Sequence, residues 1–209
     1  MTLTDAQHAM TRTVLRLHLL LFVLTAFFFN SRPAQAIGYA RIATPRLTGS
    51  YESARESAPR LLRRVYAKDV LDLPVVQQPA SNPYYVSDRK GEVTQFAMVS
   101  QYGNLGLLAH NTLAGKHFFQ LAVGQEIRLT YENGRSEYFV VTEILRFQAF
   151  QPESVSSSFR DVEGSETLSA VEMFNRIYVG GSRLVFQTCI EAKGDPSWGR
   201  LFVIAVPKK

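Results

Sequence analysis

The sequence predicts a mainly β domain with a few short helices, preceded by an N-terminal helical segment. Apolar runs, several of them alternating with polar residues, recur along the chain after residue 84, and turn residues separate them. The clearest helical spacing of apolar residues lies before residue 72. With 209 residues, the chain has room for one domain with a single core and some appendages.

The first 36 residues have the pattern of a secretory signal peptide. Arg12 and Arg16 precede the apolar stretch Leu19 to Phe29, and Ala34-Gln35-Ala36 matches the small-x-small site after which signal peptidase cuts. An uncleaved membrane anchor is the alternative, but this stretch has eleven residues, whereas a membrane span needs ~20. We therefore expect export and a mature chain that begins at Ile37.

Residues 37–83 are expected to form a linker and one helix. Residues 37–50 mix Thr, Pro, Gly and Arg without a sustained period, which is typical of a linker. Apolar residues recur at three- and four-residue steps from Ser57 to Leu71, which predicts a helix. Three prolines between Asp72 and Pro83 end this helix. The compact domain is therefore expected at residues 84–207.

Strands dominate the prediction from Tyr84 onward. The expected strands are Val93 to Ser100, Leu105 to Ala109, Glu126 to Tyr131, Glu137 to Phe147, Leu184 to Cys189, and Leu201 to Val206. The turn sequence Glu132-Asn133-Gly134-Arg135 predicts a hairpin between the third and fourth of these strands. Short helical segments are expected at Leu113 to Val123 and Glu166 to Arg176, and an exposed Ser-rich connection at Gln151 to Ser165.

The composition excludes several classes of function. The net charge is +5, and the leader, with three arginines and one aspartate, contributes +2 of it, which leaves +3 for the rest. Nucleic-acid-binding proteins carry clustered basic faces, so we expect no nucleic-acid partner. The basic cluster Arg60, Arg63, Arg64 and Lys68 is interpreted as the exposed face of the predicted helix, with an anionic envelope surface as the alternative partner. A single cysteine excludes a cysteine-based zinc site, and we expect no metal or cofactor.

The single cysteine, Cys189, ends an apolar run that begins at Leu184. Because exported proteins normally pair their cysteines, an unpaired cysteine is either a reactive thiol or a buried, inert residue. The position at the end of a predicted strand favours a reactive thiol. Since a free thiol has a pKa of about 8.5, it is a weak nucleophile at neutral pH and needs an activating partner.

A histidine is the expected partner of this thiol. His110 follows the apolar run that begins at Leu105, where a side chain can reach a cleft. Its imidazolium would stabilise a thiolate and later protonate a leaving amine. His117 is the alternative, but the neighbouring Phe118 and Phe119 favour a packing role for it.

Arg200 is the third candidate residue, because it begins the last apolar run. If that run pairs with the strand of Cys189, the guanidinium returns beside the thiol, where it would stabilise negative charge on a carbonyl oxygen. A surface charge at a strand edge is the alternative. Trp198, in the predicted loop before it, would line a substrate groove or cover an edge.

Five motifs together resemble the sortases, the cysteine transpeptidases of the bacterial envelope. They are Leu107-Leu108-Ala109-His110, Phe118-Phe119, Gly124-Gln125-Glu126-Ile127, Thr188-Cys189 and Arg200. The resemblance covers Tyr84 to Pro207 and implies a closed eight-stranded β-barrel with the histidine, cysteine and arginine at one end of it. The run Val185-Phe186-Gln187-Thr188-Cys189 departs from the Thr-Leu-x-Thr-Cys pattern of the family.

The resemblance also implies a reaction. A sortase thiolate attacks the Thr-Gly bond of a C-terminal sorting signal, usually Leu-Pro-x-Thr-Gly, and an amine on a peptidoglycan precursor or a protein lysine resolves the thioacyl enzyme. It implies Cys189 as nucleophile, His110 as general acid or base and Arg200 as carbonyl stabiliser, at the cell envelope in a periplasmic or extracellular place. We expect substrate contacts by Phe186, Thr188 and Trp198, and the resemblance gives substrate choice to residues 147–182.

Three other functions are weighed against this one. A hydrolase of the same fold would pass the acyl group to water, and a non-catalytic barrel would bind a peptide or glycan without chemistry. Papain-like proteolysis is disfavoured by the order of the residues, because that family places its cysteine near the mature N-terminus and its histidine far downstream.

Overall fold

Strands make up most of the regular structure in residues 61–209, the part of the chain that the computed structural model describes. In chain order the strands are β1 (Leu62–Ala67), β2 (Leu71–Gln77), β3 (Val93–Gln95), β4 (Leu105–Leu108), β5 (Glu126–Tyr131), β6 (Ser136–Ala149), β7 (Phe159–Asp161), β8 (Thr167–Leu168), β9 (Leu184–Ala192) and β10 (Asp195–Pro207). The helices are the 3-10 helices η1 (Ala97–Tyr102) and η2 (Ala114–Gln120) and the α-helix α3 (Ala170–Tyr178). The predicted class, mainly β with short helices, is confirmed.

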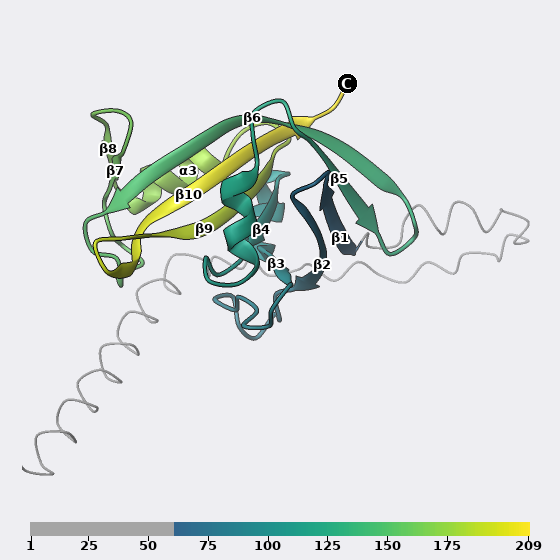
Figure 1. Ribbon diagram of the computed structural model, residues 1–209, viewed down its shortest axis with the longest axis horizontal. Coiled ribbons are helices and arrows are strands. Elements are labelled where there is room, and N and C mark those ends of the chain that lie inside the picture. Colours follow the sequence, from purple (N-terminus) through teal and green to yellow (C-terminus); the bar gives the residue numbers. More distant parts are fainter. Residues whose placement is uncertain (1–60) are drawn as a thin grey trace, which may run out of the picture. The chain divides into compact units, whose positions relative to one another are not determined.

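Eight of these strands close into a barrel (Figure 1). Their order around the sheet is β10, β9, β4, β3, β2, β1, β5 and β6, and β6 pairs again with β10, which closes the ring. β7 and β8 continue from β6 outside this ring. The pairs β2–β3 and β4–β9 are parallel, and the other pairs are antiparallel. The closed eight-stranded barrel expected from the sequence is therefore confirmed.

The barrel strands β9 and β10 are apolar on both faces. On β9, Leu184 and Phe186 belong to the core inside the barrel, whereas Val185 between them belongs to a second core outside it. β10 alternates in the same way, with Leu201 inside and Phe202 outside. Because side chains alternate along a strand, each of these positions buries its residue, and each contributes about 1.5–3 kcal/mol. This explains the continuous apolar runs in the sequence.

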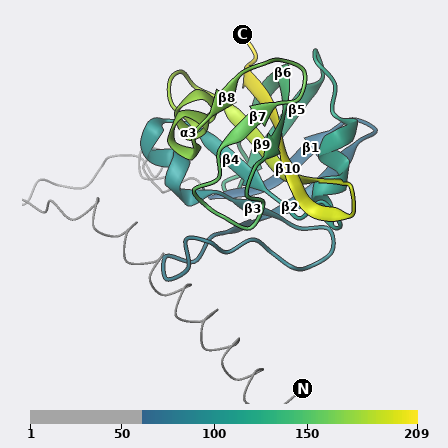
Figure 2. The ribbon, with the colours of Figure 1, turned by 90° about the vertical axis from the view of Figure 1, so that its left-hand side faces the viewer.

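Helix α3 covers the outer face of β9 and β10 and forms the second core with them (Figures 1 and 2). Met173, Ile177 and Tyr178 of the helix are buried there, together with Phe202 and Ile204 of β10. The chain therefore has a helix packed beside the strand that carries Cys189.

A capping box sets the start of α3. The hydroxyl of Ser169 accepts a hydrogen bond from the backbone N–H of Glu172, and the carboxylate of Glu172 accepts one from the backbone N–H of Ser169. The bonds from the Ser169 backbone and hydroxyl lower the pKa of Glu172. The helix predicted for residues 166–176 therefore exists but begins later, after this N-cap.

The helix predicted from Ser57 to Leu71 is wrong in its described part, where β1 and a turn lead into β2. The pairing of β1 with β5 shifts register between Leu62 and Arg64. This bulge adds one residue to β1, so that Leu62 and Val65, three residues apart, both enter the core. A three-residue spacing on a bulged strand thus imitates one face of a helix.

The domain boundary predicted at Tyr84 is also wrong, because β1 and β2 are strands of the barrel. Two basic residues of this region, Arg63 and Arg64, lie on β1, and Lys68 lies in the turn after it. Arg63 forms an ion pair with Glu132, and Nε of Arg64 lies 2.6 Å from Oδ1 of Asp72. The connection predicted for residues 151–165 contains β7, which pairs with β6.

The predicted leader and linker, residues 1–50, lie outside the described residues. The cleavage and anchor alternatives therefore stay predictions. Within residues 61–209, none of the helices has the length and apolar character that a membrane crossing requires.

Candidate active site

Cys189 lies within β9 on the outer face of the barrel. The strand continues past it to Ala192, so the thiol lies in the second half of the strand and not at its end. Phe186 and Thr188 are buried on the inner side, and alternation places Gln187 and Cys189 on the outer side. Cys189 is half-buried and forms no disulfide. A ligand on the outer face of the sheet can therefore reach the thiol.

Arg200 is the register partner of Cys189 across the antiparallel β9–β10 pair. Directly opposite residues share one face, with Cβ atoms about 4.5–5.5 Å apart, so the guanidinium and the thiol lie on the same side of the sheet. Nη1 of Arg200 donates to the carbonyls of Ser197 and Gly199 at 2.8 and 2.9 Å. Nη2 donates to the carbonyl of Pro152, in the β6–β7 connection, at 3.1 Å. The strand pairing expected from the sequence is confirmed.

His110 follows β4, which lies parallel to β9. Leu108 is the register partner of Gln187, and two residues further along each chain segment are His110 and Cys189. The His110 side chain is exposed, and its carbonyl oxygen accepts backbone hydrogen bonds from the turn that leads into η2. Among residues 61–209, no hydrogen bond joins its ring to the thiol or to the guanidinium. The neighbouring strands β4, β9 and β10 thus bring the three candidate residues to one level of the sheet.

Thr188 connects the His110 segment to β9. Its side chain is buried, and its hydroxyl donates to the carbonyl of Ala109 at 2.8 Å. Gly115 packs against the same place, where a Cβ atom would overlap with the Thr188 hydroxyl and with the carbonyls of Ala109 and His110. The structure thus gives Thr188 a position inside the barrel, where it holds the backbone next to His110, and not the substrate contact that the sequence predicts.

Phe186 is part of the core. It has no exposed surface, and its ring centroid lies 5.1 Å from that of Phe118. Phe186 is thus closed to a ligand on the outer face in this structure, and its substrate contact stays a prediction. His117 lies in η2, where its Nδ1 atom is buried and has no partner within the described residues. Trp198 is half-buried near the start of β10, and its substrate contact stays a prediction.

A cleft of about 340 Å³ extends from Arg200 along the outer face of the barrel. Leu108, Gln187 and Phe202 form its sheet side, and α3 forms the opposite side. Its lining from α3 and the segment before it consists of Ser154, Val155, Phe159, Ala170, Met173, Phe174 and Tyr178. Residues 147–182, expected to set substrate choice, thus line the space next to Arg200.

Gln187 and Tyr178 in this cleft were missed in the sequence. Gln187 lies two residues before Cys189 on the same strand, and residues two apart on a strand share a face. This spacing is the one sequence signal that could have placed Gln187 on the outer face. No sequence signal places Tyr178 beside it, because that contact depends on how α3 packs on the sheet.

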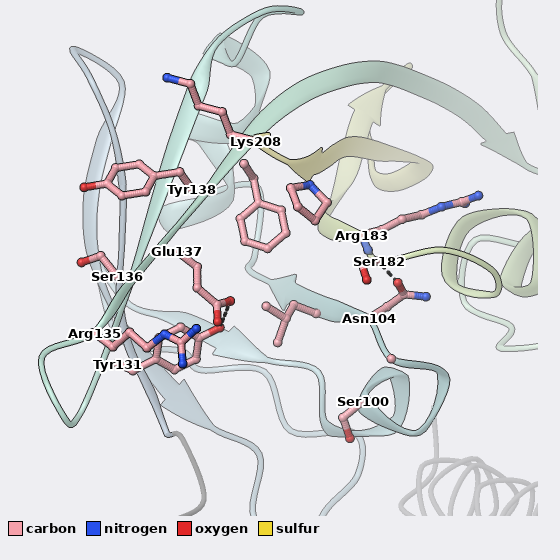
Figure 3. Close-up of a pocket in the computed structure, with 14 residues that line it drawn as sticks. Ser100, Asn104, Tyr131, Arg135, Ser136, Glu137, Tyr138, Ser182, Arg183 and Lys208 are labelled. Carbon is pink, nitrogen blue, oxygen red and sulfur yellow. Dashed lines mark hydrogen bonds between the residues drawn. The ribbon is translucent and has the colours of Figure 1, made fainter. Parts of the chain in front are cut away.

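A larger cavity of about 650 Å³ lies toward the other end of the same strands (Figure 3). It is lined by the start of β4, β6 and β9 and by the end of β10. Figure 3 shows Glu137 accepting a hydrogen bond from Tyr131 at 2.7 Å, and Asn104 accepting one from the backbone of Arg183 at 2.7 Å. Cys189, His110 and Arg200 do not line this cavity.

The site by the cleft combines a thiol, an imidazole and a guanidinium, which together suit acyl transfer. Within residues 61–209, no three His, Cys, Asp or Glu side chains are grouped as ligands of a metal ion.

Solved structures of sortases are similar to this chain. Sortase C1 from Streptococcus suis has a TM-score of 0.49 and 15% identity, over 76% of this chain and 79% of that chain. A sortase D5 transpeptidase from Clostridium perfringens has a TM-score of 0.45 and 14% identity, over 76% and 86%. Sortase A from Listeria monocytogenes has a TM-score of 0.44 and 14% identity, over 71% and 88%. The sequence matches no family model and no curated protein. Because these TM-scores lie below 0.5, we derive the function from the residues of the chain.

Proposed function

We propose that the chain is a sortase-like cysteine transpeptidase that cleaves a C-terminal sorting signal and transfers the acyl group to an amine. The observation that carries this proposal is the register pair of Cys189 and Arg200, with His110 at the same level just past the end of the neighbouring strand β4. A thiol alone is common and inert. A thiol opposite a guanidinium, next to a cleft, has the groups that acyl transfer needs.

The reaction follows from these three groups. The Cys189 thiolate forms a bond to the substrate carbonyl carbon, and the carbonyl oxygen becomes an oxyanion to which Arg200 donates hydrogen bonds. When this intermediate collapses, the C–N bond breaks and the His110 imidazolium gives its proton to the leaving amine. A thioester remains on Cys189. An incoming amine then attacks the thioester, its proton passes to His110, and the thiolate departs.

The surroundings of Arg200 support its role. Backbone carbonyls take only part of the donors of its guanidinium, so donors remain for a substrate oxygen. The bond to Pro152 fixes the guanidinium from the side of the β6–β7 connection. A group held in place before the reaction stabilises an oxyanion without reorganisation.

The proposed partners are envelope proteins that carry a C-terminal sorting signal, with an amine of a peptidoglycan precursor or a protein lysine as acceptor. The cleft beside Arg200 supports a peptide substrate, because it is mostly apolar and lies on the outer face that carries the thiol. A hydrolase is the second candidate, because His110 is exposed and water can therefore approach the thioester.

Intact-mass spectrometry of the 209-residue chain, incubated with a pool of sorting-signal peptides, tests the proposal. The wild type should gain an acyl mass that hydroxylamine discharges as a hydroxamate, and Cys189→Ala should gain none. The two histidines give a matched pair: His110→Gln should stop turnover, and His117→Gln should retain it. Release of free acid in the presence of amine identifies a hydrolase. No adduct, together with a Cys189 that alkylates no faster than a model thiol, contradicts both enzymatic functions.

A further inference from the structure

Gln187 is a polar residue on the sheet side of the cleft. It lies two residues before Cys189 on the outer face of β9, opposite Phe202 of β10. The side chains around it in the cleft are mostly apolar, with Leu108 and Met173 among them. Gln78 also lines the cleft, but its Nε2 donates to the carbonyls of Pro83 and Tyr85 and its Oε1 accepts from the backbone N–H of Ala97. A substrate group beside β9 therefore meets the half-buried amide of Gln187 among mostly apolar side chains.

Tyr178 determines which end of this amide faces the cleft. Its hydroxyl donates a hydrogen bond to Oε1 of Gln187. Three rings hold the ring of Tyr178, with centroids at 5.5, 5.3 and 6.4 Å for Phe96, Phe174 and Phe202. Burial raises the pKa of Tyr178, so its hydroxyl keeps its proton and remains a donor. Because Oε1 is engaged, the N–H groups of Nε2 are the ones left for a ligand.

The spacing between Gln187 and Cys189 indicates which substrate residue lies beside Gln187. Residues two apart on a strand are about 6.6 Å apart, and an extended peptide advances by the same distance over two residues. A peptide with its scissile carbonyl at Cys189 and Arg200 and its chain in the cleft therefore places the residue two positions away beside Gln187.

We propose that Gln187 determines substrate specificity by donating a hydrogen bond from Nε2 to a side-chain carbonyl of the substrate. This amide or carboxylate belongs to the residue two positions before the one that carries the scissile carbonyl. This inference rests on the proposed function, because it places the scissile bond at Cys189. Tyr178 is the positioning residue that keeps the donor end of the amide in the cleft.

The expected preference is measurable. A leucine at that substrate position leaves the Nε2 donors unpaired in apolar surroundings, whereas the nearly isosteric asparagine pairs one of them. Such a hydrogen bond corresponds to about a tenfold difference in kcat/KM. Because the contact exists before and during the reaction, the difference should be in KM and not in kcat.

The experiment uses peptides with Asn, Leu or Lys two positions before the residue that carries the scissile carbonyl. It compares the full chain with three variants of the cleft and one control variant. Gln187→Glu keeps an oxygen for the Tyr178 hydroxyl but presents an acceptor, so it should favour Lys over Asn by about tenfold. Gln187→Leu should abolish the Asn preference. Tyr178→Phe keeps the aromatic ring but removes the hydroxyl that donates to Oε1 of Gln187. The Gln187 amide can then rotate, so the preference for Asn over Leu should decrease. Gln101→Glu, the same change at an exposed site in η1, should leave the preference unchanged.

Equilibrium binding of the same peptides to Cys189→Ala separates this inference from the proposed function. Tighter binding of the Asn peptide, inverted toward Lys in Gln187→Glu, supports the inference even if no peptide acylates the wild type. Acylation of the wild type at equal kcat/KM for Asn and Leu overturns the inference and leaves the transpeptidase intact. Equal binding of all three peptides, or of none, overturns it as well.

Discussion

The inner and outer faces of β9 differ in what they contribute, although their residues alternate on a single strand. Phe186 and Thr188 face inward and are 0% and 2% exposed, whereas Gln187 and Cys189 face outward and are half-buried, and Gln187 lines the cleft. The inner residues hold the strand in the barrel, and the outer residues present reactive and polar groups to a ligand. Stability and chemistry are thus assigned to alternate positions of one segment.

This division explains why the candidate site can be rigid. A slip of one residue between β9 and β10 would turn Phe186 and Leu201 outward and expose them to water. The buried residues therefore fix the register that places Arg200 opposite Cys189. Preorganisation of the outer face is a consequence of packing on the inner face.

The largest expected effect on stability comes from Phe186→Ala on the inner face. Removal of a fully buried phenylalanine should lower the free energy of unfolding by about 3–5 kcal/mol, because it leaves a cavity in the barrel. Denaturant unfolding measures this change. Phe150→Ala, at a residue that is 45% exposed and whose ring lies 5.1 Å from the guanidinium carbon of Arg160, is the comparison variant and should lower it by only about 1 kcal/mol.

If Phe186→Ala does not fold, Phe186→Leu replaces it, because leucine keeps most of the side-chain volume. This variant should lower the free energy of unfolding by about 1.5 kcal/mol. In either variant, the thiol reactivity of the folded protein should match that of the wild type. A loss of reactivity at full stability would contradict the division between the two faces.

Arg200→Lys on the outer face should have the largest effect on the reaction. Lysine keeps the charge but loses the planar fork that binds an oxyanion and the backbone carbonyls together. We expect kcat/KM for acylation to fall by about 10²- to 10³-fold, measured by single-turnover mass spectrometry. Arg135→Lys, in the larger cavity away from the thiol, is the matched control. An equal rate for Arg200→Lys and wild type would remove Arg200 from the mechanism.

The candidate catalytic residues could be predicted because each of them borders an apolar run. His110 follows one run, and Cys189 and Arg200 lie at the two sides of a predicted hairpin, so that strand pairing alone was enough to bring the last two together. The hairpin at residues 132–135 was predictable for a similar reason, since its turn residues are local signals.

Other features depend on tertiary structure and escaped the sequence. The bulge between Leu62 and Arg64 is set by the partner strand, and it gave β1 the spacing of a helix. β9 is apolar on both faces because the barrel and α3 both cover it. Its hydrophobic pattern therefore did not show that Phe186 faces inward and Gln187 outward. The contact of Gln187 with Tyr178 needs the position of α3, which no local pattern gives.

Thr188→Val tests the link between the two faces and should have the smallest effect. Valine keeps the shape of threonine but leaves the carbonyl of Ala109, next to His110, without its donor. The free energy of unfolding should fall by about 1 kcal/mol, and kcat/KM by about fivefold, if the His110 backbone shifts. Thr188→Ser keeps the hydroxyl and should restore both, and the pH profile of kcat/KM should change only in the valine variant. A serine variant as impaired as the valine variant would assign the effect to the lost methyl group, and the inner face would then contribute stability alone.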